Sequence, residues 1–190
     1  MLRAALLIAS ATAAGAAFAQ PALMFEVDDP VLLPGESTTV RLFAGFDPRD
    51  FAIAGVATSV FASGGGWSDL SLIAPMDGPG TSTGAASGSG IDGILAGQLN
   101  FPATGGIYAD DTNPIAFWQA TYTADVVTDP TIVDIRTETT RYDVYIERQS
   151  AQSESRLDEL IEGAATIEVI PAPASAVVLA GGMLALRRRR

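Results

Sequence analysis

The chain has 190 residues, of which 22 are acidic and 11 are basic, and its formal net charge is −11. All the basic residues are arginine, and the sequence contains no histidine, lysine or cysteine. These absences exclude disulfides, a Ser-His-Asp or Cys-His nucleophile and a Schiff-base lysine, and they remove the commonest ligand of zinc and copper. Nucleic acid is excluded as a partner because phosphate binding needs clustered Lys and Arg.

The first nineteen residues have the pattern of a secretory signal peptide. Met1 to Arg3 is a short basic start, residues 4–17 are apolar, and Ala17-Phe18-Ala19 is a small-x-small cleavage site before Gln20. The sequence therefore predicts a signal helix over residues 1–19 and export by the Sec machinery. A buried N-terminal helix is the alternative interpretation.

Residues 20–169 alternate with period two, which is typical of half-buried β-strands. Three stretches alternate most clearly, and each is expected to direct one set of side chains into a core: Val40, Leu42 and Ala44; Ala116, Trp118, Ala120, Tyr122 and Ala124; and Tyr142, Val144 and Ile146. Further strands are expected at residues 23–27, 53–61, 70–74, 91–99, 131–136 and 166–169, with turn signals between them. About nine short strands predict an all-β domain over 20–169, a single antiparallel β-sandwich of jelly-roll or immunoglobulin-like type.

Two stretches within this domain allow two interpretations each. Residues 77–90 are rich in Gly, Ser and Thr, which favours a long surface loop, with a linker between two domains as the alternative. The stretch SESRLDELIEG allows a short helix through Leu157, Leu160 and Ile161 that ends at Gly163, or an irregular loop.

The last part of the chain is a short apolar run followed by arginines. Residues 174–186 carry no charge and would span about 20 Å as a helix, at about 1.5 Å per residue. Because a bilayer core is about 30 Å thick, this short hydrophobic helix is a marginal anchor, and the terminal arginines would stay on the cytoplasmic side. A plain C-terminal tail anchor is one interpretation.

The order of features in residues 170–190 resembles a PEP-CTERM sorting signal. Its parts are the Pro171-Ala172-Pro173 motif, in which alanine replaces the usual glutamate, the apolar run, and Arg187, Arg188, Arg189 and Arg190. The resemblance implies cleavage near the motif by an exosortase-type membrane protease. It also implies a transient stay in the inner membrane of a bacterium that makes exopolysaccharide, followed by release or attachment at the cell surface or in the extracellular matrix. Without both ends, six arginines and 22 acidic residues leave a net charge of −16.

A second resemblance covers about fifty residues. The stretches VLLPGESTTVRL, FAIAGVATSVFA and WSDLSLI are similar to the opening of cohesin-like and carbohydrate-binding-like jelly-roll sandwiches. In those folds, a Pro-Gly turn leads into an alternating strand and a second strand follows a loop. This resemblance implies the fold and does not imply the dockerin binding of true cohesins.

Two tryptophans are candidates for stacking on a sugar ring. Trp118 lies on the apolar face of its predicted strand and is expected in the core. Trp67 follows three glycines, so it is the candidate glycan contact, although it could instead begin a strand. Tyr108 and Tyr145 are weaker candidates.

The acidic residues form no recognisable metal or catalytic motif. Asp28-Asp29 and Asp110-Asp111 are oxygen-rich pairs of the type that calcium uses, but they lack the spaced loop of an EF-hand, which favours solvated turns. No carboxylate pair stands out for glycoside hydrolysis, and we predict no catalytic, cofactor or metal residue. The leading hypothesis is an exported, non-catalytic surface protein. A carbohydrate-binding module that acts on exopolysaccharide is the alternative, and an acidic-residue glycosidase is the third.

Overall fold

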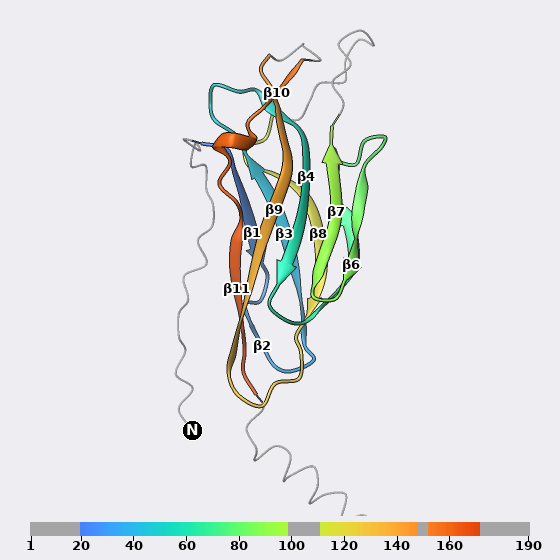
Figure 1. Ribbon diagram of the computed structural model, residues 1–190, viewed down its shortest axis with the longest axis vertical. Coiled ribbons are helices and arrows are strands. Elements are labelled where there is room, and N and C mark those ends of the chain that lie inside the picture. Colours follow the sequence, from blue (N-terminus) through green and yellow to red (C-terminus); the bar gives the residue numbers. More distant parts are fainter. Residues whose placement is uncertain (1–19, 99–110, 148–151, 172–190) are drawn as a thin grey trace, which may run out of the picture.

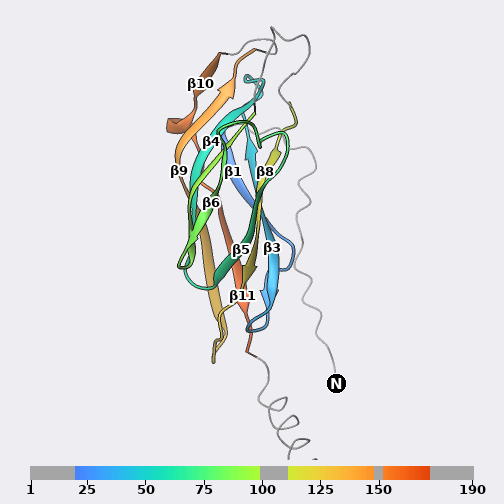
Figure 2. The ribbon, with the colours of Figure 1, turned by 90° about the vertical axis from the view of Figure 1, so that its right-hand side faces the viewer.

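Two β-sheets lie face to face along the long axis of the molecule (Figures 1 and 2). The computed structural model describes residues 20–98, 111–147 and 152–171. The smaller sheet is antiparallel and has the order β1 (Ala22–Val27), β3 (Ser37–Gly45), β8 (Ile115–Thr123) and β5 (Gly66–Leu72). The larger sheet has the order β2 (Val31–Leu32), β11 (Ala164–Val169), β9 (Thr131–Tyr145), β4 (Ala52–Ala62), β7 (Gly90–Gly97) and β6 (Ser82–Ser87), with β10 (Ser153–Ser155) paired to β9.

The prediction of an all-β sandwich is confirmed, and the alternation of the sequence explains most of its facing. In β3, Val40, Leu42 and Ala44 are buried as expected, and in β8 Trp118 is fully buried. Ala116 is the exception. The pairing of β3 with β8 shifts between Leu42 and Phe43, and this bulge turns Phe117 into the core in place of Ala116.

Residues 131–145 form one long strand where the sequence predicts two. The register between β4 and β9 shifts between Ala57 and Thr58, so Thr140 is an extra residue on β9. This bulge interrupts the alternation without ending the strand. Tyr142 and Val144 point into the core as predicted, whereas Ile146 lies beyond the strand and is only half-buried.

The prediction of a long loop over residues 77–90 is wrong, because β6 lies within it and pairs with β7. The sequence does not indicate this strand, because its small and polar side chains have low β-propensity and form no apolar face. The pairing also excludes the linker interpretation, because it joins the stretch to the same sandwich. The short strands β2 and β10 were not predicted either, and β5 begins four residues earlier than expected.

Large rings fill the space between the sheets, and several of them also donate hydrogen bonds. Tyr142 of the larger sheet donates its hydroxyl to the carbonyl of Gly45 in the smaller sheet at 2.7 Å. Trp118 of the smaller sheet donates its Nε1–H to the carbonyl of Thr83 in β6 at 3.0 Å. These bonds satisfy buried polar groups and link the sheets in a chain that has no cysteine.

The turn between β4 and β5 requires glycine. Gly65 has a φ of 83°, and a Cβ at this position would lie within 2.4 Å of the Tyr122 ring. The Tyr122 hydroxyl donates to the carbonyl of Gly64 at 3.1 Å, so the ring and the turn fit each other closely.

The stretch before β11 contains a 3₁₀ helix, Leu157–Glu159, in place of a longer helix. Leu157 and Leu160 pack against the core, whereas Ile161 lies beyond the 3₁₀ helix and is 53% exposed. The described chain starts beside this segment, where Leu23 N–H donates to the Ile161 carbonyl at 2.9 Å. The carboxyl end of β11 lies at the opposite end of the long axis (Figure 1).

Candidate interaction surface

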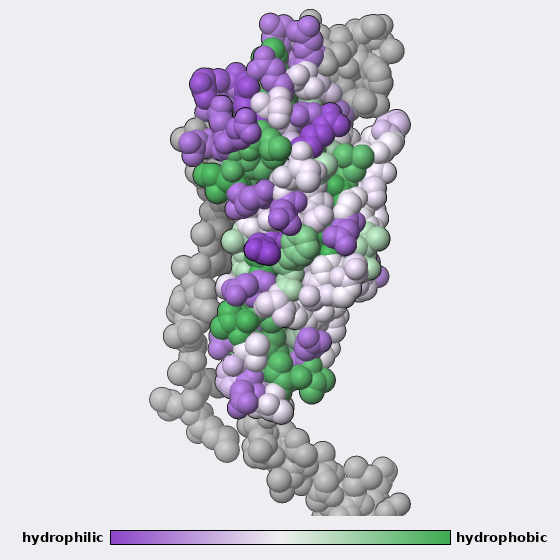
Figure 3. Space-filling model, in the orientation of Figure 1, coloured by the Kyte–Doolittle hydropathy of each residue, from purple (hydrophilic) through white to green (hydrophobic). Residues whose placement is uncertain are grey.

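The outer face of the larger sheet is formed by β9, β4, β7 and β6 and is turned toward the viewer in Figure 3. Along β4 the outward side chains are Ala57, Ser59 and Phe61, which are half-buried. Their partners across the pairing on β9 are Arg141, Glu138 and Arg136, so a row of charged side chains runs beside a row of mostly small ones. We call this surface the β4 face.

A pocket of about 230 Å³ opens on the β4 face. Gly55 and Gly97 lie opposite each other in its lining, and the Pro79–Thr81 segment, Arg141 and Tyr145 form its sides. A Cβ on Gly97 would lie 3.3 Å from the carbonyl oxygen of Ala54, so the lack of a side chain lets the two strands approach closely here. Two paired positions in the pocket lining thus carry no side chain, Gly55 within β4 and Gly97 at the end of β7.

The side of the pocket is fixed by buried hydrogen bonds. The Tyr145 hydroxyl donates to the carbonyl of Gln98 at 2.8 Å, and the Gln98 side-chain amide donates to the carbonyl of Ile53 at 2.6 Å. Arg141 is 57% exposed and its Nε donates to Asp143. Because the polar groups behind the pocket are satisfied internally, a partner would meet a preformed wall with one exposed guanidinium on its rim.

A cation also lies over an aromatic ring on the β4 face. The guanidinium carbon of Arg136 is 5.7 Å from the centre of the Phe61 ring. This distance is within the range of a cation–π interaction. Arginine and aromatic residues are enriched in protein–protein interfaces, so this pair suits a protein partner.

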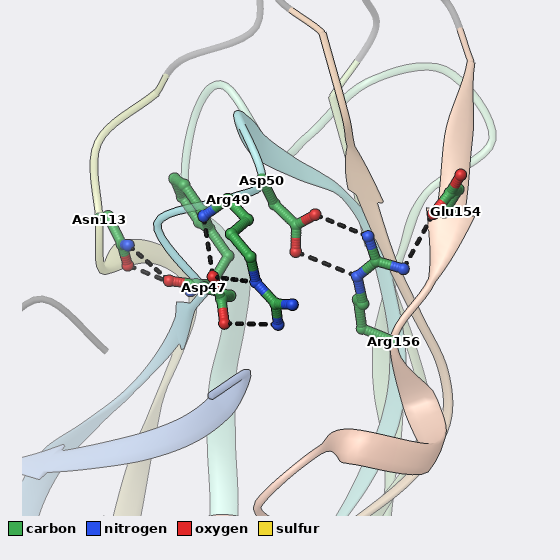
Figure 4. Close-up of polar contacts among 7 residues, drawn as sticks. Asp47, Arg49, Asp50, Asn113, Glu154 and Arg156 are labelled. Atoms are coloured by element: carbon green, nitrogen blue, oxygen red, sulfur yellow. Dashed lines mark hydrogen bonds and ion pairs between the residues drawn. The ribbon is translucent and has the colours of Figure 1, made fainter. Parts of the chain in front are cut away.

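One end of the sandwich is closed by ion pairs between loops (Figure 4). The Asp50 carboxylate, of which 2% is exposed, accepts hydrogen bonds from Arg156 Nη2 at 2.8 Å and Nε at 3.1 Å. Arg156 also pairs with Glu154 at 2.9 Å. The hydrogen bond with Asp50 is the main cause that raises the pKa of Arg156 above its ordinary value. This bidentate pair ties the β3–β4 loop to the segment after β10.

Two further contacts complete this end cluster, which consists of Asp47, Arg49, Asp50, Asn113, Glu154 and Arg156. Hydrogen bonds from the Arg49 side chain and backbone N–H lower the pKa of Asp47. The Asn113 side chain binds the backbone of Phe46 in both directions, at 3.2 Å to N and 2.8 Å to O. The cluster is therefore held together by the chain's own groups.

Trp67, the candidate glycan contact, is a core residue and the second residue of β5. Its side chain is 8% exposed, and its ring lies 5.1 Å from the Tyr122 ring in an edge-to-face arrangement. The indole Nε1–H donates to the carbonyl of Ser89 at 2.8 Å. A ring in this position offers no open face for stacking on a sugar. The carbohydrate-binding alternative thereby loses its best residue.

Most of the other predicted site residues have structural partners or lie outside the described ranges, and Asp111 is exposed. Tyr145 is 6% exposed and supports the pocket wall, while Tyr108 and Asp110 are not described. Asp28 pairs with Arg41, and Asp29 accepts a hydrogen bond from Val31 N–H. Within the described residues, no group of three or more acidic side chains is placed to hold a metal ion.

The predicted processing segments lie almost wholly outside the described residues. The signal helix over 1–19 with Ala17 and Ala19, and residues 172–190 with Ala172, Pro173, Arg187, Arg188, Arg189 and Arg190, are not described. Gln20 and Pro171 are the first and last residues of the described chain. No helix within the described ranges is long and apolar enough to cross a bilayer.

Sequence reasoning missed both the β4 face and the end cluster. Its only signal for the face was the run of small residues in FAIAGVATSVFA, which leaves one side of β4 without bulk. The Asp50–Arg156 pair has no sequence signal, because 106 positions separate the two residues.

Comparisons with protein-family models and with curated proteins find no match to this chain. Solved structures of cohesin modules do match it. The seventh ScaB type I cohesin of Pseudobacteroides cellulosolvens aligns with a TM-score of 0.52 and 13% identity, over 81% of this chain and 95% of that module. An OlpC cohesin in a type I cohesin–dockerin complex of Clostridium thermocellum aligns with a TM-score of 0.52 and 11% identity, over 84% and 99%. The sixth cohesin of scaffoldin B of Acetivibrio cellulolyticus, in complex with a mutant dockerin, aligns with a TM-score of 0.50 and 10% identity, over 78% and 97%. The chain thus has the β-sandwich fold of cohesin modules.

Proposed function

We propose that this protein is an exported, non-catalytic module whose β4 face binds a protein partner. The observation that carries the proposal is the preformed pocket over Gly55 and Gly97, with exposed Arg141 on its rim. The fold supports it, because two of the similar cohesins were solved in complexes with dockerins. The expected partner is a protein whose surface is complementary to this pocket, which is lined by glycines and has an arginine on its rim.

The chemistry of the chain supports a role without catalysis. The sequence lacks histidine, cysteine and lysine, so a general acid would have to be a carboxyl group or a tyrosine. In the end cluster, the pKa of Asp47 is lowered by Arg49, which is the opposite of what a general acid needs. Asp50 is engaged on both oxygens by Arg156.

We further propose that residues 1–19 direct export and that residues 170–190 act as a PEP-CTERM-like sorting signal read by an exosortase-type protease. The position of the motif supports this proposal. Ile170 N–H donates to the carbonyl of Leu32 at 2.9 Å, and Pro171 follows directly. Cleavage at Pro171, Ala172 or Pro173 would therefore cut just outside the sandwich and leave its hydrogen bonds intact.

The partner-binding proposal is tested by one arginine substitution on the β4 face and a matched control substitution elsewhere. Ala57→Arg places a large cation in the middle of the β4 face, whereas Thr121→Arg places the same side chain on the outer face of the smaller sheet. Each variant is immobilised and exposed to the proteins secreted by the producing cells. We expect a protein that is retained by the wild type and by Thr121→Arg and is lost with Ala57→Arg. Equal retention by both variants would contradict a binding role for the β4 face.

The sorting proposal is tested by intact-mass spectrometry of the exported protein. We expect the mass of a chain that begins at Gln20 and has lost the four arginines. Replacing Arg187, Arg188, Arg189 and Arg190 with Ser should misplace the protein without unfolding it, because the tail follows the last strand. Recovery of a chain that still ends at Arg190 from the medium would refute the processing.

A further inference from the structure

The outer edge of β6 ends the larger sheet, and we call it the β6 edge. β6 pairs with β7 on one side, and no strand in the described part of the chain pairs with its other side. Besides the pairing with β7, the backbone at its centre takes part in two long, local bonds, from Gly84 N–H to Ser82 Oγ at 3.2 Å and from Thr83 Oγ1 to the Gly84 carbonyl at 3.3 Å, and in the bond from the Trp118 indole to the Thr83 carbonyl. An edge of this kind is a template for another strand.

The β6 edge also differs from the other edges in charge. Residues 78–91 contain no charged side chain, in a chain with twice as many acidic as basic residues. The other edge strands of three or more residues in the described ranges each carry a carboxylate: Glu26 in β1, Asp69 in β5 and Glu154 in β10. Glu26 and Glu154 are paired with Arg41 and Arg156, so repulsion between two copies of this acidic chain is expected mainly at Asp69. At the β6 edge they can approach without such repulsion.

The side chains of β6 permit the close approach that strand pairing requires. Ala85, Ala86 and Ser87 are exposed and small, and β6 contains neither the proline nor the lysine with which proteins commonly protect an edge. Paired strands lie about 4.8 Å apart, so bulky or charged groups here would interfere. The pale, nearly neutral area over β6 and β7 in Figure 3 shows this composition on the surface.

The backbone of β6 is held in place for pairing from the inside. Trp118 donates its Nε1–H to the Thr83 carbonyl at 3.0 Å, which attaches β6 to the opposite sheet. In Figure 2, β6 and β5 lie on the same side of the sandwich, so this side is formed by the two ends of the sheets. An incoming strand would therefore meet an ordered strand.

We propose that the β6 edge pairs antiparallel with the β6 edge of a second copy of this chain. A strand edge that pairs antiparallel with itself generates a two-fold axis, which gives a closed dimer. The two larger sheets then form one continuous sheet, and both β4 faces point to the same side of it. This self-association is independent of the partner proposed above, because it uses the edge of the sheet and not its face.

Single-cysteine cross-linking tests the pairing directly, since the chain has no cysteine of its own. Ala85→Cys and Ala86→Cys place a thiol on the β6 edge, and Thr140→Cys places one at an exposed position of β9 as the control. The protein is purified in the form that the producing cell makes, with its N- and C-terminal segments processed or retained as they are there, and is oxidised gently. We expect a disulfide-linked dimer from at least one β6 variant and several-fold less from Thr140→Cys. Equal cross-linking of all three, or none in the β6 variants, would overturn the proposal.

Sedimentation velocity over a range of concentrations provides a second measurement. The wild type should shift toward twice its monomer mass as its concentration rises. Ala86→Lys should stay monomeric where the control Thr140→Lys still dimerises, and circular dichroism confirms that both are folded. A wild type that remains monomeric throughout, or a dimer that both variants retain, would overturn the proposal. Neither outcome affects the Ala57→Arg test of the β4 face, so the two proposals fail separately.

Discussion

The end cluster and the β6 edge deal with an excess of negative charge in opposite ways. In the end cluster, carboxylates are brought together and neutralised by Arg49 and Arg156, which closes the loops at that end. At the β6 edge there is no charge to neutralise, and the exposed backbone is the available interacting group. An acidic protein with few cations can therefore join the loops of one region through its arginines. A second region can stay available for contact with another chain if it contains no acidic residue.

The largest expected effect comes from the residue that attaches the β6 edge to the rest of the sandwich. Trp118→Ala removes a fully buried indole and should lower the free energy of unfolding by about 3–5 kcal/mol. It also removes the donor to Thr83, so backbone amides of β6 should exchange faster in hydrogen-exchange measurements. Urea melts give the stability, and Trp118→Phe, which keeps a ring but no donor, is the control. A stable Trp118→Ala with protected β6 amides would mean that this attachment is unimportant.

The next effect tests the end cluster. Arg156→Leu leaves the Asp50 carboxylate buried without its bidentate partner. Breaking a fully buried pair costs about 3–5 kcal/mol, and because 23% of the Arg156 side chain is exposed we expect about 2–3 kcal/mol. Arg141→Leu removes a pair with a more exposed arginine and should cost about 1 kcal/mol or less. Equal losses for the two variants in urea melts would show that the end cluster is no stronger than an ordinary surface pair.

A smaller effect concerns the turn after β4, where the Tyr122 hydroxyl donates to the Gly64 carbonyl and no ion pair is needed. Burial raises the pKa of Tyr122 to about 12. Because the folded state holds this proton above the ordinary pKa of 10.0, its stabilisation is present below about pH 10 and is lost as the pH rises toward 12. Tyr122 should contribute a loss of up to about 1 kcal/mol between about pH 10 and 11, which Tyr122→Phe should lack. Burial also raises the pKa of Tyr142, so part of the loss should remain in that variant. No lysine titrates in this range, so denaturant melts at several pH values report mainly on the tyrosines.

The smallest effect is expected at the β6 edge itself. Ala86→Lys changes an exposed side chain and should alter the free energy of unfolding by about 0.5 kcal/mol or less. Thermal or urea melts at a concentration low enough to keep the protein monomeric give this value. A large loss would show that Ala86 supports the monomer, and the edge would then be less open than its exposure indicates.

The core strands could be predicted from sequence because burial on one side imposes alternation on residues such as Val40 and Leu42. Local irregularities broke that signal. The bulge at Phe117 reversed the facing of Ala116, and the extra Thr140 made one strand look like two. β6 was missed because its backbone pairs with β7 while its small side chains carry almost no apolar pattern.

The candidate site was harder to predict than the fold. The sequence placed Trp67 in a glycine-rich loop, yet Gly65 turns the chain so tightly that the indole lies against Tyr122 in the core. The pocket depends on Gly55 lying opposite Gly97, and the end cluster depends on Asp50 meeting Arg156. These are long-range pairings set by register and topology, which no short stretch of sequence records.

The position of β11 next to the edge of the larger sheet has a mechanical consequence. β11 lies between β9, with which it pairs antiparallel over six residues, and β2, with which it pairs in parallel, and it leads directly to Pro171. Hydrogen bonds between strands run across the strand direction. A pull applied at Pro171 along β11, as from a tether on the carboxyl side, would load these bonds together in shear and would not peel them apart one by one. Such an arrangement resists force far better than its bond count implies, which suits a module that is held at one end while a partner pulls on its face.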